Sequence, residues 1–228
     1  LYESSRIKTI VCRQEGGAAM MAEAAGKLSG KPGVCFVTRG PGATNASIGV
    51  HIAQQDSTPM VLFVGLPGRD VVDREAFQEF DLVGVFRALA KGSEIVTDTA
   101  RIPEYVSRAF HRAASGRPGP VVVGLPEDVL SGLAEPTQVA AAHPASPSPA
   151  PADMAVLATT LQKATRVLAI VGGPGWSEAT RTTLEEAARR LELPLACAFR
   201  FQDFVDNRHP HYVGHVGIGI DGKLAARI

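Results

Sequence analysis

The sequence predicts an α/β fold: a parallel-sheet, three-layer domain followed by part of a second, Rossmann-like α/β domain. Short apolar runs typical of buried strands alternate with helix-like runs, which is the pattern of parallel βαβ units. A Pro/Ala/Ser-rich segment at 134–152 interrupts this alternation and cannot build a core of its own. We therefore expect one domain at 1–133, a linker at 134–152 and a partial second domain at 153–228.

The first domain is expected to contain strands at 7–12, 33–38, 59–64, 93–97 and 120–124. Helices are expected at 16–29, 42–55, 81–90 and 101–115. In the last helix Pro103 falls in the first turn, where its missing N–H has no helical partner to lose. Alternation of this kind predicts a sheet covered by helices on both faces.

The second domain is expected to run as helix 153–164, strand 166–171, helix 177–191 and strand 194–198. A glycine-rich turn, Gly172 to Gly175, joins the first strand to its helix. Such a turn is found in phosphate cradles and equally in plain β–α connections, so both interpretations stay open.

Composition narrows the classes of partner. The 228 residues are 45% apolar and 20% charged, as in ordinary soluble proteins, and 23 basic side chains balance 23 acidic ones. This balance gives no argument for a nucleic acid or a membrane as partner, and no apolar run has the length of a membrane span. The cysteines, Cys12, Cys35 and Cys197, are odd in number and lack a CxxC pair, which favours a reducing cytoplasm over a disulfide framework. Because Leu1 is not a methionine and 221–228 resembles the opening of a helix, we expect an internal fragment of a longer protein.

Glu15 is the first candidate functional residue. It lies in Arg13-Gln14-Glu15-Gly16-Gly17, between an apolar run and a helix-like run. A carboxylate there can meet a ligand at the carboxyl edge of a sheet, or it can simply complement the dipole of a first helical turn.

The second candidate is the Gly40-Pro41-Gly42 segment after the strand at 33–38. It is not a P-loop, because no Gly-Lys-Ser/Thr follows. It is a poor dinucleotide fingerprint, because Asn45 stands where the third glycine belongs. A ligand-binding loop and a tight turn remain as alternatives.

Taken together, five segments resemble the pyrimidine-binding domain of thiamine-diphosphate enzymes of the acetolactate synthase group. They occur in order at compatible spacings over residues 7 to 130, and the similarity continues more loosely from residue 153. The segments are RQEGGAA at 13–19, VTRGPGATN at 37–45, QDSTP at 55–59, EAFQE at 75–79 and SGRPGPV at 115–121.

The resemblance implies thiamine diphosphate as cofactor and a 2-oxo acid as substrate. It implies that Glu15 is the catalytic carboxylate, hydrogen-bonded to N1′ of the aminopyrimidine ring. The cofactor-binding residues it implies are Pro41, Gly42, Asn45, Gln78 and Arg117, with Arg117 assigned to the FAD of flavin-bearing members. The substrate residues it implies are Phe77 and Lys91.

Two departures limit what the resemblance implies. Gly65-Leu66 stands where the family commonly has Gly-Gln, and the Gly-Asp-Gly…Asn-Asn pattern that holds Mg²⁺ and the diphosphate is absent, so we expect no metal ligands in this chain. We expect an acetolactate-synthase-like enzyme that decarboxylates and ligates 2-oxo acids, with these 228 residues inactive alone. A homodimer or homotetramer with its site at the subunit interface is implied. The alternatives are a benzoylformate-type decarboxylase and a non-catalytic nucleotide-binding module.

Overall fold

A computed structural model of the chain describes residues 4–135, 137–141, 143–145 and 147–228. The chain separates into two compact units, residues 1–145 and 146–228. This division falls inside the segment 134–152 that the sequence marks as a linker. Each unit is described by itself below.

The first unit is built on a four-stranded sheet in the order β1-β2-β4-β3, in which all neighbouring strands are parallel. The strands are β1 (Gly33–Thr38), β2 (Met60–Leu66), β3 (Gly92–Ile95) and β4 (Pro120–Pro126). Val34 pairs with Val61, which pairs with Val121, which pairs with Gly92. The carboxyl ends of β1, β2 and β4 therefore lie at one edge of the sheet, where parallel α/β folds carry their ligands.

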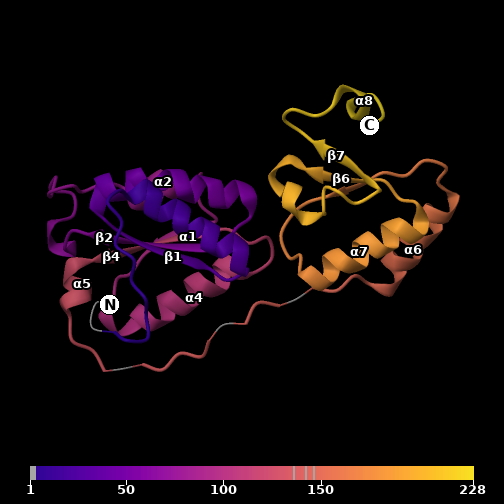
Figure 1. Ribbon diagram of the computed structural model, residues 1–228. Helices are drawn as coiled ribbons and strands as arrows, with labels where there is room; N and C mark the ends of the chain where they lie inside the picture. Colours follow the sequence, from indigo (N-terminus) through magenta and orange to yellow (C-terminus); the bar gives the residue numbers. More distant parts are fainter. Residues whose placement is uncertain (1–3, 136, 142, 146) are drawn as a thin grey trace. The chain divides into compact units, whose positions relative to one another are not determined.

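Helices cover both faces of this sheet (Figure 1). One face packs against α1 (Glu15–Ser29) and α2 (Arg39–Asp56), the other against α4 (Ile102–Ala114). The alternation along β2 follows this division: Leu62 and Val64 belong to the core under α1 and α2, and Val61 and Phe63 to the core under α4. Two shorter helices, α3 (Leu82–Phe86) and α5 (Glu127–Ser131), follow β2 and β4.

The expected strand at 7–12 is not formed. Residues 7–12 adopt no regular structure, and the side chains of Ile10 and Val11 are 60% and 91% exposed. Among the described residues, β1 pairs only with β2, so this apolar run has no strand beside it. A strand needs both a neighbour and buried faces, and a run of apolar residues cannot by itself guarantee either.

The second unit contains a three-stranded parallel sheet in the order β5-β6-β7. Its elements are α6 (Pro151–Lys163), β5 (Ala169–Val171), α7 (Glu178–Leu191), β6 (Leu195–Ala198), β7 (Tyr212–Val216) and α8 (Gly222–Ala225). The indole N–H of Trp176 donates to the Gly172 carbonyl at 3.2 Å, which ties down the glycine-rich turn after β5. The α/β fold with parallel sheets is thus confirmed, and β7 is a strand that the sequence analysis missed.

Candidate functional site

Glu15 is the first residue of α1. The helix is capped by Gln14, whose side-chain oxygen accepts from the backbone N–H of Gly17 at 2.6 Å. The Glu15 carboxylate is partly exposed and lies at the positive end of the helix dipole. Although no strand leads into it, Glu15 still reaches the carboxyl edge of the sheet, because α1 packs beside α2, which begins where β1 ends.

Asn45 holds one oxygen of this carboxylate. Its side-chain amide donates to Oε2 of Glu15 at 3.1 Å, from the second turn of α2. A hydrogen bond from an amide fixes the orientation of the carboxylate that accepts it. Glu15 and Asn45, which the resemblance assigned separately to catalysis and cofactor binding, therefore lie in contact.

The contact depends on a close crossing of α1 and α2. A methyl group on Gly49 would lie 2.6 Å from Cβ of Ala19, and one on Gly16 would lie 3.1 Å from the Asn45 carbonyl oxygen. Both glycines are buried. Because glycine has no side chain, the two helix backbones approach each other closely enough at these positions for the Asn45 amide to reach Glu15.

Pro41 and Gly42 lie in the first turn of α2, which begins at Arg39, three residues before the expected start at 42. Pro41 costs no hydrogen bond there. Gly42 is buried, and a methyl group on it would lie 3.4 Å from Cβ of Val37 and 3.8 Å from Oε1 of Glu15. Space therefore remains beside the Glu15 oxygen that Asn45 does not hold, as a flat ring approaching that oxygen requires.

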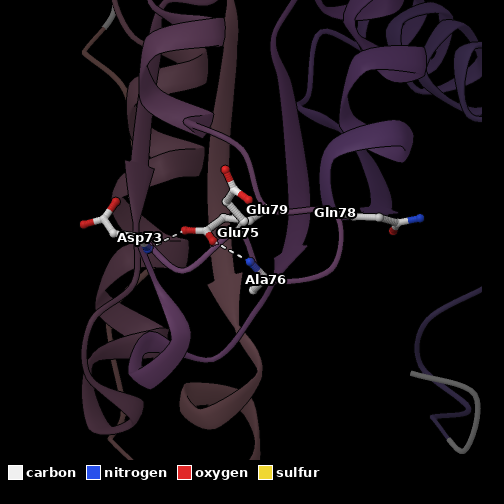
Figure 2. Close-up of a pocket in the computed structure, with 5 residues that line it drawn as sticks. All are labelled: Asp73, Glu75, Ala76, Gln78 and Glu79. Carbon is white, nitrogen blue, oxygen red and sulfur yellow. Dashed lines mark hydrogen bonds between the residues drawn. The ribbon is translucent and has the colours of Figure 1, made fainter.

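The 73–79 loop meets the start of α2 at the same edge. The carbonyl of Gln78 accepts from the backbone N–H of Gly40 at 3.1 Å. Inside the loop, the Glu79 carboxylate accepts from the backbone N–H groups of Asp73 at 2.7 Å and Ala76 at 2.8 Å (Figure 2). These backbone hydrogen bonds, that from Asp73 first, lower the pKa of Glu79 below its usual value.

The same loop lines a shallow, open hollow of about 430 Å³. Figure 2 shows the Gln78 side chain directed away from the acidic side chains of the loop. The Phe77 side chain is 75% exposed. Of the two residues that the resemblance placed near cofactor and substrate, Phe77 is thus mostly exposed, and Gln78 is partly exposed.

Lys91 and Arg117 lie elsewhere. Lys91 precedes β3 and its backbone N–H donates to the Pro120 carbonyl at 2.8 Å, at the amino edge of the sheet. Burial, then the charge of Arg112, lowers the pKa of Lys91. Arg117 is at the same edge, where its Nε donates to the Ser57 hydroxyl at 2.8 Å. Within this unit neither residue joins Glu15, and Lys91 does not share a site with Phe77.

Arg39 and Glu127 are two polar residues near the Glu15 carboxyl edge that the sequence analysis missed. The Arg39 guanidinium donates to the Phe77 carbonyl at 3.0 Å and pairs with the Glu127 carboxylate. Arg39 directly precedes the Gly-Pro-Gly segment, and its charged side chain at the end of a predicted strand is the signal that could have revealed it.

Below the site lies Cys35, on the face of β1 that α1 and α2 cover. Burial, and then the nearby Cys12 and Glu15, raise the pKa of its thiol to about 11. Within the part of the chain that the structure describes, no three His, Cys, Asp or Glu side chains are grouped so as to hold a metal ion.

Two family models match the chain. Residues 1–85 match the thiamine pyrophosphate enzyme N-terminal TPP binding domain, and residues 154–227 match the thiamine pyrophosphate enzyme central domain. The chain belongs to the thiamine pyrophosphate enzymes. Residues 1–85 include Glu15, Asn45 and the 73–79 loop, so these residues lie in the part that matches the TPP binding domain.

Among its relatives are acetolactate synthase subunits. The acetolactate synthase large subunit of Parasynechococcus marenigrum is 37% identical over 219 residues, which cover 93% of this chain and 35% of the relative. The isozyme 2 large subunit of Escherichia coli is 34% identical over 221 residues, covering 96% of this chain and 40% of the relative. The chloroplastic acetolactate synthase of Arabidopsis thaliana is 43% identical over 136 residues, which cover 60% of this chain and 20% of the relative.

This thiamine pyrophosphate enzyme chain spans well under half the length of these relatives, 35% and 40% for the first two. Within the described ranges, none of its helices combines the length and apolar character that crossing a membrane requires.

Proposed function

We propose that the chain is the pyrimidine-binding part, with a portion of the central domain, of an acetolactate-synthase-like enzyme. The enzyme decarboxylates a 2-oxo acid and ligates the product to a second carbonyl compound. The observation that carries the proposal is the Glu15 carboxylate at the carboxyl edge of the sheet, held at Oε2 by Asn45 and open toward Gly42 at Oε1.

The residues present fit thiamine diphosphate. An aminopyrimidine ring offers a ring nitrogen that shares a proton with a carboxylate, and Glu15 has one oxygen available for that bond. When bound, thiamine diphosphate supplies a nucleophilic carbon that adds to the carbonyl of a 2-oxo acid and accepts the electron pair released with carbon dioxide.

The residues around the Glu15 carboxylate then have defined tasks. Glu15 holds a proton at the pyrimidine nitrogen, and Asn45 keeps its carboxylate aligned. Pro41 and Gly42 line the path to that carboxylate, and Gln78 and Phe77 face cofactor and substrate from the 73–79 loop. The resemblance also assigns Lys91 to the substrate and Arg117 to an FAD, but both lie at the other edge of the sheet, so we give them no task at the Glu15 carboxylate.

The remaining parts of the site lie outside these residues. We assign the Mg²⁺ ligands and the diphosphate contacts to another domain, and the complete site to the interface of a homodimer or homotetramer. The chain alone is expected to be inactive. Its three free cysteines suit a reducing compartment such as the cytoplasm.

Glu15→Gln tests the proposal in the whole enzyme, that is, this chain together with a diphosphate-binding domain. Turnover of pyruvate should fall by about 100-fold or more, because the amide cannot hold a proton for the ring nitrogen. The control is Glu104→Gln, which should leave turnover unchanged. Glu104 is an exposed carboxylate on α4 that pairs with Arg101. Near-normal turnover in Glu15→Gln would refute the proposal.

Two further measurements separate the alternatives. Calorimetric titration with thiamine diphosphate and Mg²⁺ should give saturable binding, and a nucleotide-binding module would show none. Product analysis with pyruvate distinguishes a synthase, which releases acetolactate, from a simple decarboxylase, which releases only aldehyde.

A further inference from the structure

Arg39 occupies an unusual place at the carboxyl edge. It is the first residue of α2, directly after β1, and its backbone is left-handed, with φ of 36°. Non-glycine residues seldom adopt this conformation, because Cβ crowds the backbone. The side chain is only 20% exposed, so it is directed along the protein surface and not into solvent.

The Arg39 guanidinium joins segments that are distant in the sequence. One nitrogen, Nη1, donates to the Phe77 carbonyl at 3.0 Å, and the other, Nη2, pairs with the Glu127 carboxylate at the end of β4. The guanidinium carbon also lies 5.9 Å from the centre of the Phe77 ring. A planar guanidinium serves two acceptors in fixed directions, whereas an ammonium group donates from a single nitrogen on a flexible stem.

The 73–79 loop needs such an anchor. Three of its residues have a left-handed backbone, with φ between 54° and 63°: Asp73, Glu75 and Gln78. Because non-glycine residues seldom adopt such φ values, the loop conformation needs contacts with the rest of the unit to be stable. The Glu79 carboxylate organises the interior of the loop. Two hydrogen bonds, Arg39–Phe77 and Gly40–Gln78, fix the Phe77 and Gln78 end of the loop to the start of α2.

We infer that Arg39 is a positioning residue for the substrate side of the proposed site. It fixes Phe77 and Gln78 of the 73–79 loop against the start of α2 and the end of β4. The substrate role of the loop rests on the proposed function, whereas its fixation by Arg39 does not. Since Glu127 neutralises its charge, Arg39 acts on the loop and does not itself bind a substrate carboxylate.

Hydrogen exchange on the 228-residue chain tests the fixation. Arg39→Gly removes the side chain and also suits the left-handed backbone, so the start of α2 is retained. Backbone amides of residues 73–79 should exchange roughly tenfold faster, because a charge-assisted hydrogen bond is lost. Arg39→Lys should give an intermediate rate. Arg101→Ala removes an arginine that likewise pairs with a carboxylate, Glu104, and lies over an aromatic ring, Tyr105, and should change nothing in the loop.

Unchanged exchange in Arg39→Gly would overturn the inference. If Arg39→Gly fails to fold, Arg39→Lys and Glu127→Gln report on the same contacts, and wild-type exchange in both would overturn it equally. In the whole enzyme, Arg39→Gly should raise KM for the 2-oxo acid severalfold while thiamine diphosphate affinity is retained. Faster exchange in Arg39→Gly with an unchanged KM would show that the 73–79 loop has no role in substrate binding. If the wild-type enzyme fails to bind thiamine diphosphate, the proposed function is wrong, but the exchange result still shows whether Arg39 fixes the loop.

Discussion

Asn45 donates its side-chain amide to Oε2 of Glu15 at 3.1 Å across 30 positions of sequence. The two residues come from different helices, and their contact follows from the tight crossing at Gly16 and Gly49. The hydrogen bond leaves Oε1 as the oxygen beside Gly42. It therefore determines which oxygen of Glu15 is available to a cofactor.

Asn45→Ala should reduce activity far more than stability. The Asn45 side chain is exposed, so the free energy of unfolding of this chain should change by no more than about 1 kcal/mol. In the whole enzyme, turnover should fall at least tenfold, because the Glu15 carboxylate loses the donor that aligns it. Urea denaturation and steady-state kinetics measure the two effects. A variant that loses stability and activity in proportion would show that Asn45 has only a structural role.

The sequence predicted β1 to the residue, because Pro32-Gly33 opens a continuous apolar run and Arg39-Gly40 closes it. The equally apolar run at 7–12 failed as a strand, because strand formation depends on a neighbour that local pattern cannot reveal. The strand β7 was missed for the opposite reason. Its histidine and glycine residues give a weak strand pattern, and its pairing with β6 compensates for that.

Site prediction had a similar limit. Glu15 and Asn45 were each recognised from a motif, but their hydrogen bond depends on how α1 crosses α2, which is a tertiary property. Arg39 gave a weak signal, because a lone arginine in a glycine-rich turn usually faces solvent. Lys91 and Arg117 match motifs, yet only strand register reveals that they lie at the other edge of the sheet.

Gly49→Ala should destabilise the first unit. The added methyl group would meet Ala19 Cβ at 2.6 Å and Met20 N at 2.9 Å, so the helices must separate. Overpacking of this kind costs about 1–3 kcal/mol. Chemical denaturation measures the loss. Gly17→Ala is the matched control, because its methyl group would find its nearest neighbour at 3.7 Å and alanine favours helix. Equal stabilities for the two variants would contradict the close crossing.

Asp128 should contribute stability that disappears in acid. The side-chain hydrogen bond from Arg69, at 2.6 Å, is the main reason that the pKa of Asp128 lies below its usual value. A lowered pKa means that the contribution is complete above the unfolded value of about 3.9 and is lost as pH falls through the folded value. The difference in unfolding temperature between wild type and Asp128→Asn should be constant from about pH 7 to pH 5 and should shrink below about pH 4.

The control for that measurement is Glu135→Gln, an exposed side chain after α5. It should show little difference from wild type at any pH, because an exposed side chain contributes little to stability. If the difference in unfolding temperature between wild type and Asp128→Asn instead grows as the pH falls, the ion pair with Arg69 does not stabilise the folded chain.

The cysteines should report on the charge at Glu15. Cys35 is 5% exposed with a pKa of about 11, so only about one thiol in a thousand is ionised at pH 8. Cys197 is fully buried, whereas Cys12 is partly exposed. A maleimide at pH 8 should therefore modify one thiol quickly, and Cys12→Ser should remove that fast phase. Because the Glu15 charge contributes to the raised pKa of Cys35, Glu15→Gln should speed the slow labelling of Cys35 modestly, as followed by mass spectrometry. Two fast thiols in the native chain would show that β1 is not covered as described.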